Sequence, residues 1–336
     1  MTDNILTSAK SRKRNHAIDL MKFLAALLIT NSHMVSLYPD SYNRMATGGA
    51  IGDALFFFCS GFLLMGGTMT DFFNWYKRRI NRIYPTIIVI SIIGIVVFGN
   101  DPSFKFVLLG GGGWFVQAIL VFYAFFWFVK RFLINKLWIV YSIVGVLIII
   151  WFCFFWNKAL FILSDNTYLR WPCFFSMMLL GITIYKGEER NKRPHHKLWC
   201  TIILLFASIV LYYGYQLLEV RFPVLLNFQL LLIPVLMAIV VLFYQICSHP
   251  LVIKLYTNNN SVYLLLFYIS SCCLEIYLSG RWSFWIGEKL IGLFPLNIII
   301  CFLLIFCIAY LVKVFSNFIR QTFSAEDYNW IKVFKL

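Results

Sequence analysis

Long apolar runs with few charged residues recur along the whole chain of 336 residues, and they are the feature that most limits what it can fold into. Hydrophobic residues make up 61% and charged residues 13%, with a mean hydropathy of +0.80. Soluble domains are about 45–50% apolar and about 25% charged. The runs are continuous rather than alternating, which excludes an outer-membrane barrel, and the composition excludes disorder, collagen, coiled coils and disulfide-rich secreted scaffolds. We therefore predict an all-α protein, a polytopic bundle of membrane-spanning helices.

Ten segments have the length and apolarity expected of a membrane crossing, which takes about 20 residues. They are 18–38, 51–69, 84–98, 114–129, 137–156, 171–186, 198–217, 224–247, 261–278 and 291–315. The basic start resembles a signal peptide, but no small-residue cleavage site follows the first run, so we predict a retained helix. The predicted organisation is a basic cytoplasmic N-terminal segment (1–17), a ten-helix membrane domain (18–315) and a cytoplasmic C-terminal tail (316–336).

The distribution of Lys and Arg among the loops gives the orientation. With a cytoplasmic N-terminus, 21 of the 29 Lys and Arg residues fall in inside segments and 7 in outside loops, while Lys22 lies within the first span. Cytoplasmic loops of membrane proteins carry this excess of positive charge. The split predicts an even number of spans with both termini in the cytoplasm. It also accounts for the net charge of +15 without nucleic acid, so we expect membrane lipid and no nucleic acid as a partner.

Few ionisable residues lie inside the predicted spans, and such residues are costly enough to mark functional sites. The first span carries Asp19, Lys22 and His33, the second begins with Asp53, and the ninth carries Glu275 near its predicted outer end. His33 is the one histidine within a span. Eleven residues turn a helix slightly more than three full turns, so Lys22 and His33 share a face about 16 Å apart, with Asp19 placed to pair with Lys22. The alternative interpretation is that Asp19, Lys22 and His33 are ordinary residues of the membrane interface without a function. None of the nine Cys has metal-ligand spacing, and we predict no metal site.

Four motifs in order resemble those of the acyltransferase 3 family of integral membrane O-acyltransferases. Lys22 precedes His33 by eleven positions in the stretch that starts Ala17-Ile18-Asp19, and the second span reads Phe56-Phe57-Phe58-Cys59-Ser60-Gly61-Phe62. The next inside segment reads Tyr76-Lys77-Arg78-Arg79-Ile80-Asn81-Arg82-Ile83-Tyr84-Pro85, and the fourth span opens Gly113-Trp114-Phe115. One feature departs from the pattern: many members end a late span with Tyr-Leu-x-His, and here Gly280 replaces that His, which puts a second catalytic His in doubt.

The resemblance implies transfer of an acyl group, commonly acetyl, from cytoplasmic acyl-CoA to a hydroxyl of an envelope sugar, polysaccharide or lipid-linked glycan, in the bacterial inner membrane. Imidazole suits removal of the hydroxyl proton, so His33 is the expected general base, although a covalent acyl-His is also possible. The guanidinium groups of Arg78, Arg79 and Arg82 would hold the donor phosphates, unless they simply reflect the positive-inside rule. Lys22 would line the path of the pantetheine arm or hold a phosphate.

The remaining candidates have weaker signals. Asp53 could polarise the acceptor or assist His33 in catalysis, or it could cap the second span. Trp114 could stack on a sugar, or belong to the interfacial aromatic belt. Glu275 is expected to bind substrate or replace the missing histidine, and Ser60-Gly61 to allow close helix packing. A transporter or exporter of a glycan or small anion would use the same polar residues, and a structural scaffold would leave them unexplained.

Overall fold

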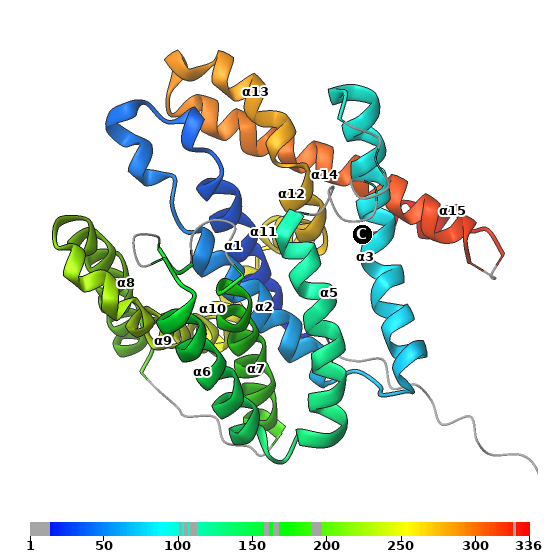
Figure 1. Cartoon of the computed structure of the whole chain (residues 1–336). Coiled ribbons are helices and arrows are strands. Elements are labelled where there is room, and N and C mark those ends of the chain that lie inside the picture. Colours follow the sequence, from blue (N-terminus) through cyan, green and yellow to red (C-terminus); the bar gives the residue numbers. More distant parts are fainter. Residues whose placement is uncertain are drawn as a thin grey trace, which may run out of the picture.

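The computed structural model describes residues 14–100, 103, 107, 113–157, 161–163, 168–189, 197–324 and 327–336. These residues form helices and connecting turns, and no strand occurs among them (Figure 1). The α-helices are α1 (His16–Ser32), α2 (Gly49–Met65), α3 (Phe72–Phe98), α5 (Gly113–Phe128), α6 (Leu137–Phe154), α7 (Arg170–Glu189), α8 (Leu198–Arg221), α9 (Leu232–Ser248), α10 (Pro250–Thr257), α11 (Asn260–Ser271), α12 (Cys273–Ser279), α13 (Arg281–Lys289), α14 (Leu296–Thr322) and α15 (Trp330–Val333). Shorter turns are η1 (Val35–Leu37), η2 (Asp40–Met45), the π-turn η4 (Val129–Leu133), η5 (Pro223–Leu231) and η6 (Ile291–Leu293).

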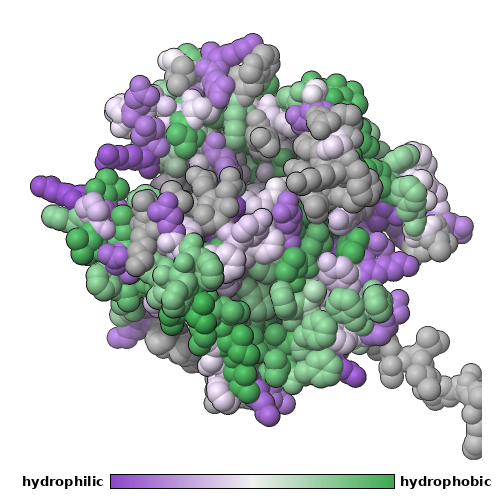
Figure 2. Space-filling model, viewed as in Figure 1, coloured by the Kyte–Doolittle hydropathy of each residue, from purple (hydrophilic) through white to green (hydrophobic). Residues whose placement is uncertain are grey.

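The prediction of an all-α polytopic membrane bundle is confirmed. Each of the ten predicted spans overlaps a helix. Seven helical segments of the described chain are long and apolar enough to cross a bilayer, or eight if α11 and α12, which meet at 63°, count as one broken span. α1 has only 17 residues, so the count of ten remains a prediction. Figure 2 shows a broad apolar surface between hydrophilic margins, as expected for a lipid-facing belt.

Several predicted boundaries differ from the structure, and three of the differences affect the site. α1 ends at Ser32 rather than at residue 38, because the chain turns into η1. α3 begins at Phe72, twelve residues before the predicted start, because Asp71 caps its N-terminus and the helix continues through Pro85. The predicted segment 84–98 was therefore too short, and the basic segment before it belongs to the same helix. α14 likewise continues to Thr322, into the predicted tail.

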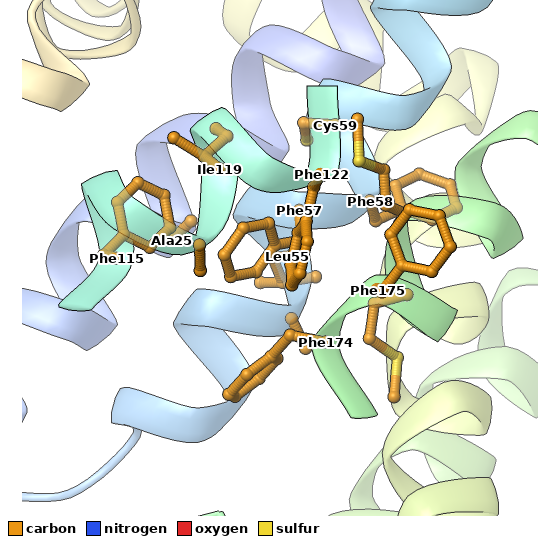
Figure 3. Close-up of a cluster of buried hydrophobic side chains, with 14 of the residues drawn as sticks. Ala25, Leu55, Phe57, Phe58, Cys59, Phe115, Ile119, Phe122, Phe174 and Phe175 are labelled. Carbon is orange, nitrogen blue, oxygen red and sulfur yellow. The ribbon is translucent and has the colours of Figure 1, made fainter. Parts of the chain in front are cut away.

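Aromatic side chains and two glycines hold the centre of the bundle together. A Cβ atom on Gly61 of α2 would lie 2.0 Å from the carbonyl oxygen of Met178 in α7, and one on Gly181 would lie 2.2 Å from that of Phe58. The two helices therefore approach until their backbones touch, as small residues allow in membranes and as Ser60-Gly61 indicated. Phenylalanines from α2, α5 and α7 fill the space beside this contact (Figure 3), and Phe57 is fully buried.

Candidate functional site: a basic cavity between α1, α3, α12 and α14

A cavity of about 910 Å³ lies where α1, α2, α3, α5, α12 and α14 meet. Its described lining contains nine basic side chains and two acidic ones. The basic side chains are Arg14, Lys22, Arg78, Arg79, Arg82, Lys313, Arg320, Lys332 and Lys335, and the acidic ones are Asp19 and Glu275. So large an excess of positive charge in a partly enclosed space is costly unless an anion fills it. The cavity is therefore suited to a polyanionic ligand.

The three arginines predicted to bind phosphate all line this cavity, on the first turns of α3. Arg78 donates a hydrogen bond to Thr70 Oγ1 at 2.9 Å, and the guanidinium of Arg79 lies 5.0 Å from the Trp75 ring centroid. Arg79 Nε is buried and makes no hydrogen bond, so it can still donate to a ligand. The helix start is fixed by Asp71, whose pKa is lowered because its carboxylate accepts hydrogen bonds from the backbone and side chain of Asn74.

Asp19 and Lys22 of the first span also face the cavity, but they do not form the predicted pair. Asp19 forms a salt bridge with Arg14, which also donates to Ser270 Oγ at 3.2 Å and lies 3.9 Å from the Phe267 ring centroid. Arg14 reaches Asp19 from the segment before α1, and Lys22 lines the cavity without pairing with this carboxylate. In the described residues, no carboxylate pairs with Lys22, which leaves its ammonium available to a ligand.

Glu275 lies in the same cavity, not in a separate outer site. The break between α11 and α12 turns the second half of this span inward, so that Glu275 is 1% exposed. Its Oε1 accepts hydrogen bonds from Lys313 Nζ at 3.2 Å and from Thr86 Oγ1 at 3.1 Å, whereas its buried Oε2 has no partner. The prediction that Glu275 sits near the outer end of the span reflects an assumption of a straight helix.

Lys313 and Arg320 are site residues that the sequence analysis missed. They lie seven positions apart on α14, with Asn317 between them, so all three share one helix face. A row of polar side chains on one face of an otherwise apolar helix could have indicated this part of the site from the sequence. Both residues also count toward the positive charge of the C-terminal end, which accounts for them without a site.

His33 does not line the cavity. It is the residue immediately after α1, its side chain is exposed, and its ring centroid lies 6.4 Å from that of Tyr277. The Tyr277 ring lies 4.9 Å from Phe115, which does line the cavity. Contacts through these two aromatic rings connect His33 with the lining of the basic cavity.

Asp53 and Trp114 belong to a different group, and neither lines the cavity. The Arg170 guanidinium lies 3.7 Å from the Trp114 ring centroid and exerts an electrostatic attraction on Asp53. The N-cap of α2 is Gly48, so Asp53 lies one turn inside and does not cap the helix. One buried oxygen of Asp53 has no hydrogen-bond partner. The face of Trp114 toward Arg170 is covered, which leaves less of the ring for stacking on a sugar.

The fold and cavity define a multi-pass integral membrane protein built around a basic internal site. Residues 15–314 match the family model Acyl_transf_3, an acyltransferase domain, and the chain belongs to this family. No curated protein and no solved structure gave a significant match. The family confirms the resemblance carried by the four sequence motifs. The protein is an acyltransferase, of the class of membrane O-acyltransferases.

Proposed function

We propose that the protein transfers an acyl group, most simply acetyl, from acyl-CoA to a hydroxyl of an envelope sugar, polysaccharide or glycolipid, in the bacterial inner membrane. The observation that carries the proposal is the basic cavity in a member of an acyltransferase family. Coenzyme A carries a pyrophosphate and a 3′-phosphate, and nine basic side chains against two acidic ones match that charge. No metal is needed for this reaction.

The donor would enter the cavity with its phosphates against α3 and its pantetheine arm pointing inward. Guanidinium groups bind phosphate through paired N–H donors, which fits Arg78, Arg79 and Arg82. Lys22 and Glu275, deeper in the lining, would contact the arm: the ammonium can donate to its amide carbonyls and the free Glu275 Oε2 can accept from its amide N–H groups.

His33 would act as general base on the acceptor. The acceptor oxygen forms a bond to the thioester carbonyl carbon, its proton passes to the imidazole, and the bond to sulfur breaks. Coenzyme A leaves as the thiolate and takes a proton from the imidazolium, which restores neutral His33. The ring contacts from His33 to Tyr277 and from Tyr277 to Phe115 support a route between donor and base along these side chains, which would have to make room for the thioester. Asp53 and Trp114 would face the acceptor.

The test is incubation of purified protein with isotope-labelled acetyl-CoA and envelope glycan and lipid extracts, followed by mass spectrometry. Label should appear in one acceptor. His33→Gln should lower the rate at least about 100-fold, the usual contribution of a general base. The matched control is His249→Asn, since His249 only caps α10 and Asn is also a good N-cap.

Binding of acyl-CoA separates this proposal from a transporter of a glycan or small anion. Arg79→Ala should weaken acyl-CoA binding while the protein remains folded and monodisperse. A protein that binds no acyl-CoA, yet moves a glycan across vesicle membranes, would support the transporter instead.

A further inference from the structure

The C-terminal segment 327–336 is docked against α14 and contributes to the wall of the cavity (Figure 1). The buried Asn317 donates both amide hydrogens to this segment, to the carbonyl oxygens of Val333 at 3.1 Å and Lys335 at 2.9 Å. Gln321 and Asn329 exchange two further hydrogen bonds, both of 2.7 Å. Because Val333 is only 2% exposed, an apolar anchor accompanies these polar contacts.

Arg320 connects this docked segment with the arginines of α3. Its Nη1 donates to Asn317 Oδ1 at 3.2 Å and its Nη2 to the carbonyl oxygen of Arg82 at 3.3 Å. Its Nε is buried, lines the cavity region and has no hydrogen-bond partner. A buried guanidinium N–H without an acceptor is costly, so this donor points to an anionic ligand atom.

The two ends of the cavity differ in burial. Lys332 and Lys335 are exposed, which places them at the mouth, whereas Phe115 and Cys59 in the same lining are 1% exposed. Acyl-CoA is a linear molecule with the thioester at one end and the adenosine 3′-phosphate at the other. If the thioester points toward Phe115 and the aromatic rings beside His33, the 3′-phosphate must lie at the mouth.

We propose that Arg320 and Lys335 form a subsite for the 3′-phosphate of the acyl-CoA donor, separate from the pyrophosphate contacts of Arg78, Arg79 and Arg82. This inference rests on the proposed function, because it assumes the donor is a coenzyme A ester. It gives the docked C-terminal segment a binding role, and it makes the enzyme selective between coenzyme A and nucleotides that lack the 3′-phosphate.

The test compares the binding of coenzyme A and 3′-dephospho-coenzyme A by the purified full-length protein, using calorimetry in detergent. The natural protein should bind coenzyme A at least about tenfold more tightly, as expected for charge-assisted hydrogen bonds to one phosphate. In Arg320→Gln and in Lys335→Gln this ratio should fall, approaching one in the double variant. Arg79→Ala should weaken both ligands and keep the ratio. Lys136→Gln, which removes an exposed lysine outside the cavity, is the matched control.

Each result decides between the two proposals. Equal affinity of the natural protein for both ligands, or an unchanged ratio in the variants, would overturn the 3′-phosphate subsite and leave the proposed function standing. Binding of neither ligand would overturn acyl-CoA as donor. Lys335 is exposed, so Lys335→Gln keeps the test decisive if Arg320→Gln fails to fold.

Discussion

At the scale of single residues, the pair formed by Glu275 and Lys313 is the most constrained part of the cavity. The two side chains are 2% and 17% exposed, and Thr86 supplies a further hydrogen bond to the carboxylate. Breaking a buried ion pair leaves one uncompensated charge, which costs about 3–5 kcal/mol. We therefore expect Lys313→Met to lower the free energy of unfolding by about 3 kcal/mol, measured by denaturant titration in detergent micelles.

The control is the double variant Glu275→Leu/Lys313→Met, in which no charge is left behind. It should recover most of the lost stability, because replacing both partners of a buried pair by apolar residues is often neutral. If both proteins lose stability equally, packing around Lys313 rather than the charge accounts for the effect.

At the scale of helices, the approach of α2 to α7 depends on the absence of side chains at the contact. Gly61→Ala places a methyl group against the α7 backbone, so the helices must separate, at a cost of about 1–3 kcal/mol. Gly145→Ala in α6 is the comparison, because its Cβ would meet nothing within 4 Å. It should raise stability by about 0.5–1 kcal/mol. Thermal unfolding of both variants measures the difference, and equal effects would contradict the close-contact account.

The turn that precedes the arginines of α3 is held by a residue from another helix. The π-turn η4 directs Lys130 Nζ toward the end of α2, where it donates to the carbonyl oxygens of Leu64, Met65 and Gly67 at 3.0, 2.6 and 2.7 Å. The carbonyl groups at the end of a helix lack the N–H donors of a following turn, and the Leu64 oxygen accepts from the backbone after the helix, at Gly66 and Gly67. Lys130→Met should cost about 1.5–3 kcal/mol in thermal unfolding, since hydrogen bonds to a charged donor are lost. Lys136→Met should change stability by less than about 0.5 kcal/mol; a similar loss there would rule out a specific role for Lys130.

At the scale of the whole molecule, the charge distribution predicts which end of the bundle faces the cytoplasm. Several basic segments meet at one end of the bundle. Lys130 contacts the end of α2, and Lys186 Nζ donates to the Ile134 carbonyl oxygen at 2.7 Å. Because 21 of the Lys and Arg residues fall in inside segments and 7 in outside loops, this end should be cytoplasmic.

A labelling experiment tests this orientation. In intact cells, a membrane-impermeant maleimide should label Arg44→Cys and should spare Lys136→Cys until the membrane is permeabilised. The parent protein, which has its own exposed cysteines, gives the background. The reverse pattern would invert the orientation.

The sequence alone determined the fold class and the family, and it identified five of the cavity's charged residues, which are Asp19, Lys22, Arg78, Arg79 and Arg82. Continuous apolar runs specify membrane helices because the bilayer leaves few other ways to satisfy the backbone. The arginines of α3 lie within one helical stretch, so their shared face could be read from spacing. The same local reasoning identified Lys22 and the small-residue contact at Gly61.

Only the tertiary structure decided which distant residues share the cavity. Glu275 faces Lys313 because a bend between α11 and α12 and the packing of α14 bring these side chains together, and Asp19 pairs with Arg14 from the segment before α1 rather than with Lys22. The tertiary structure also placed the C-terminal segment at the mouth and His33 outside the lining, in contact with it through Tyr277 and Phe115. Periodicity describes one helix at a time, whereas pairing across helices depends on crossing positions and breaks that no single segment encodes.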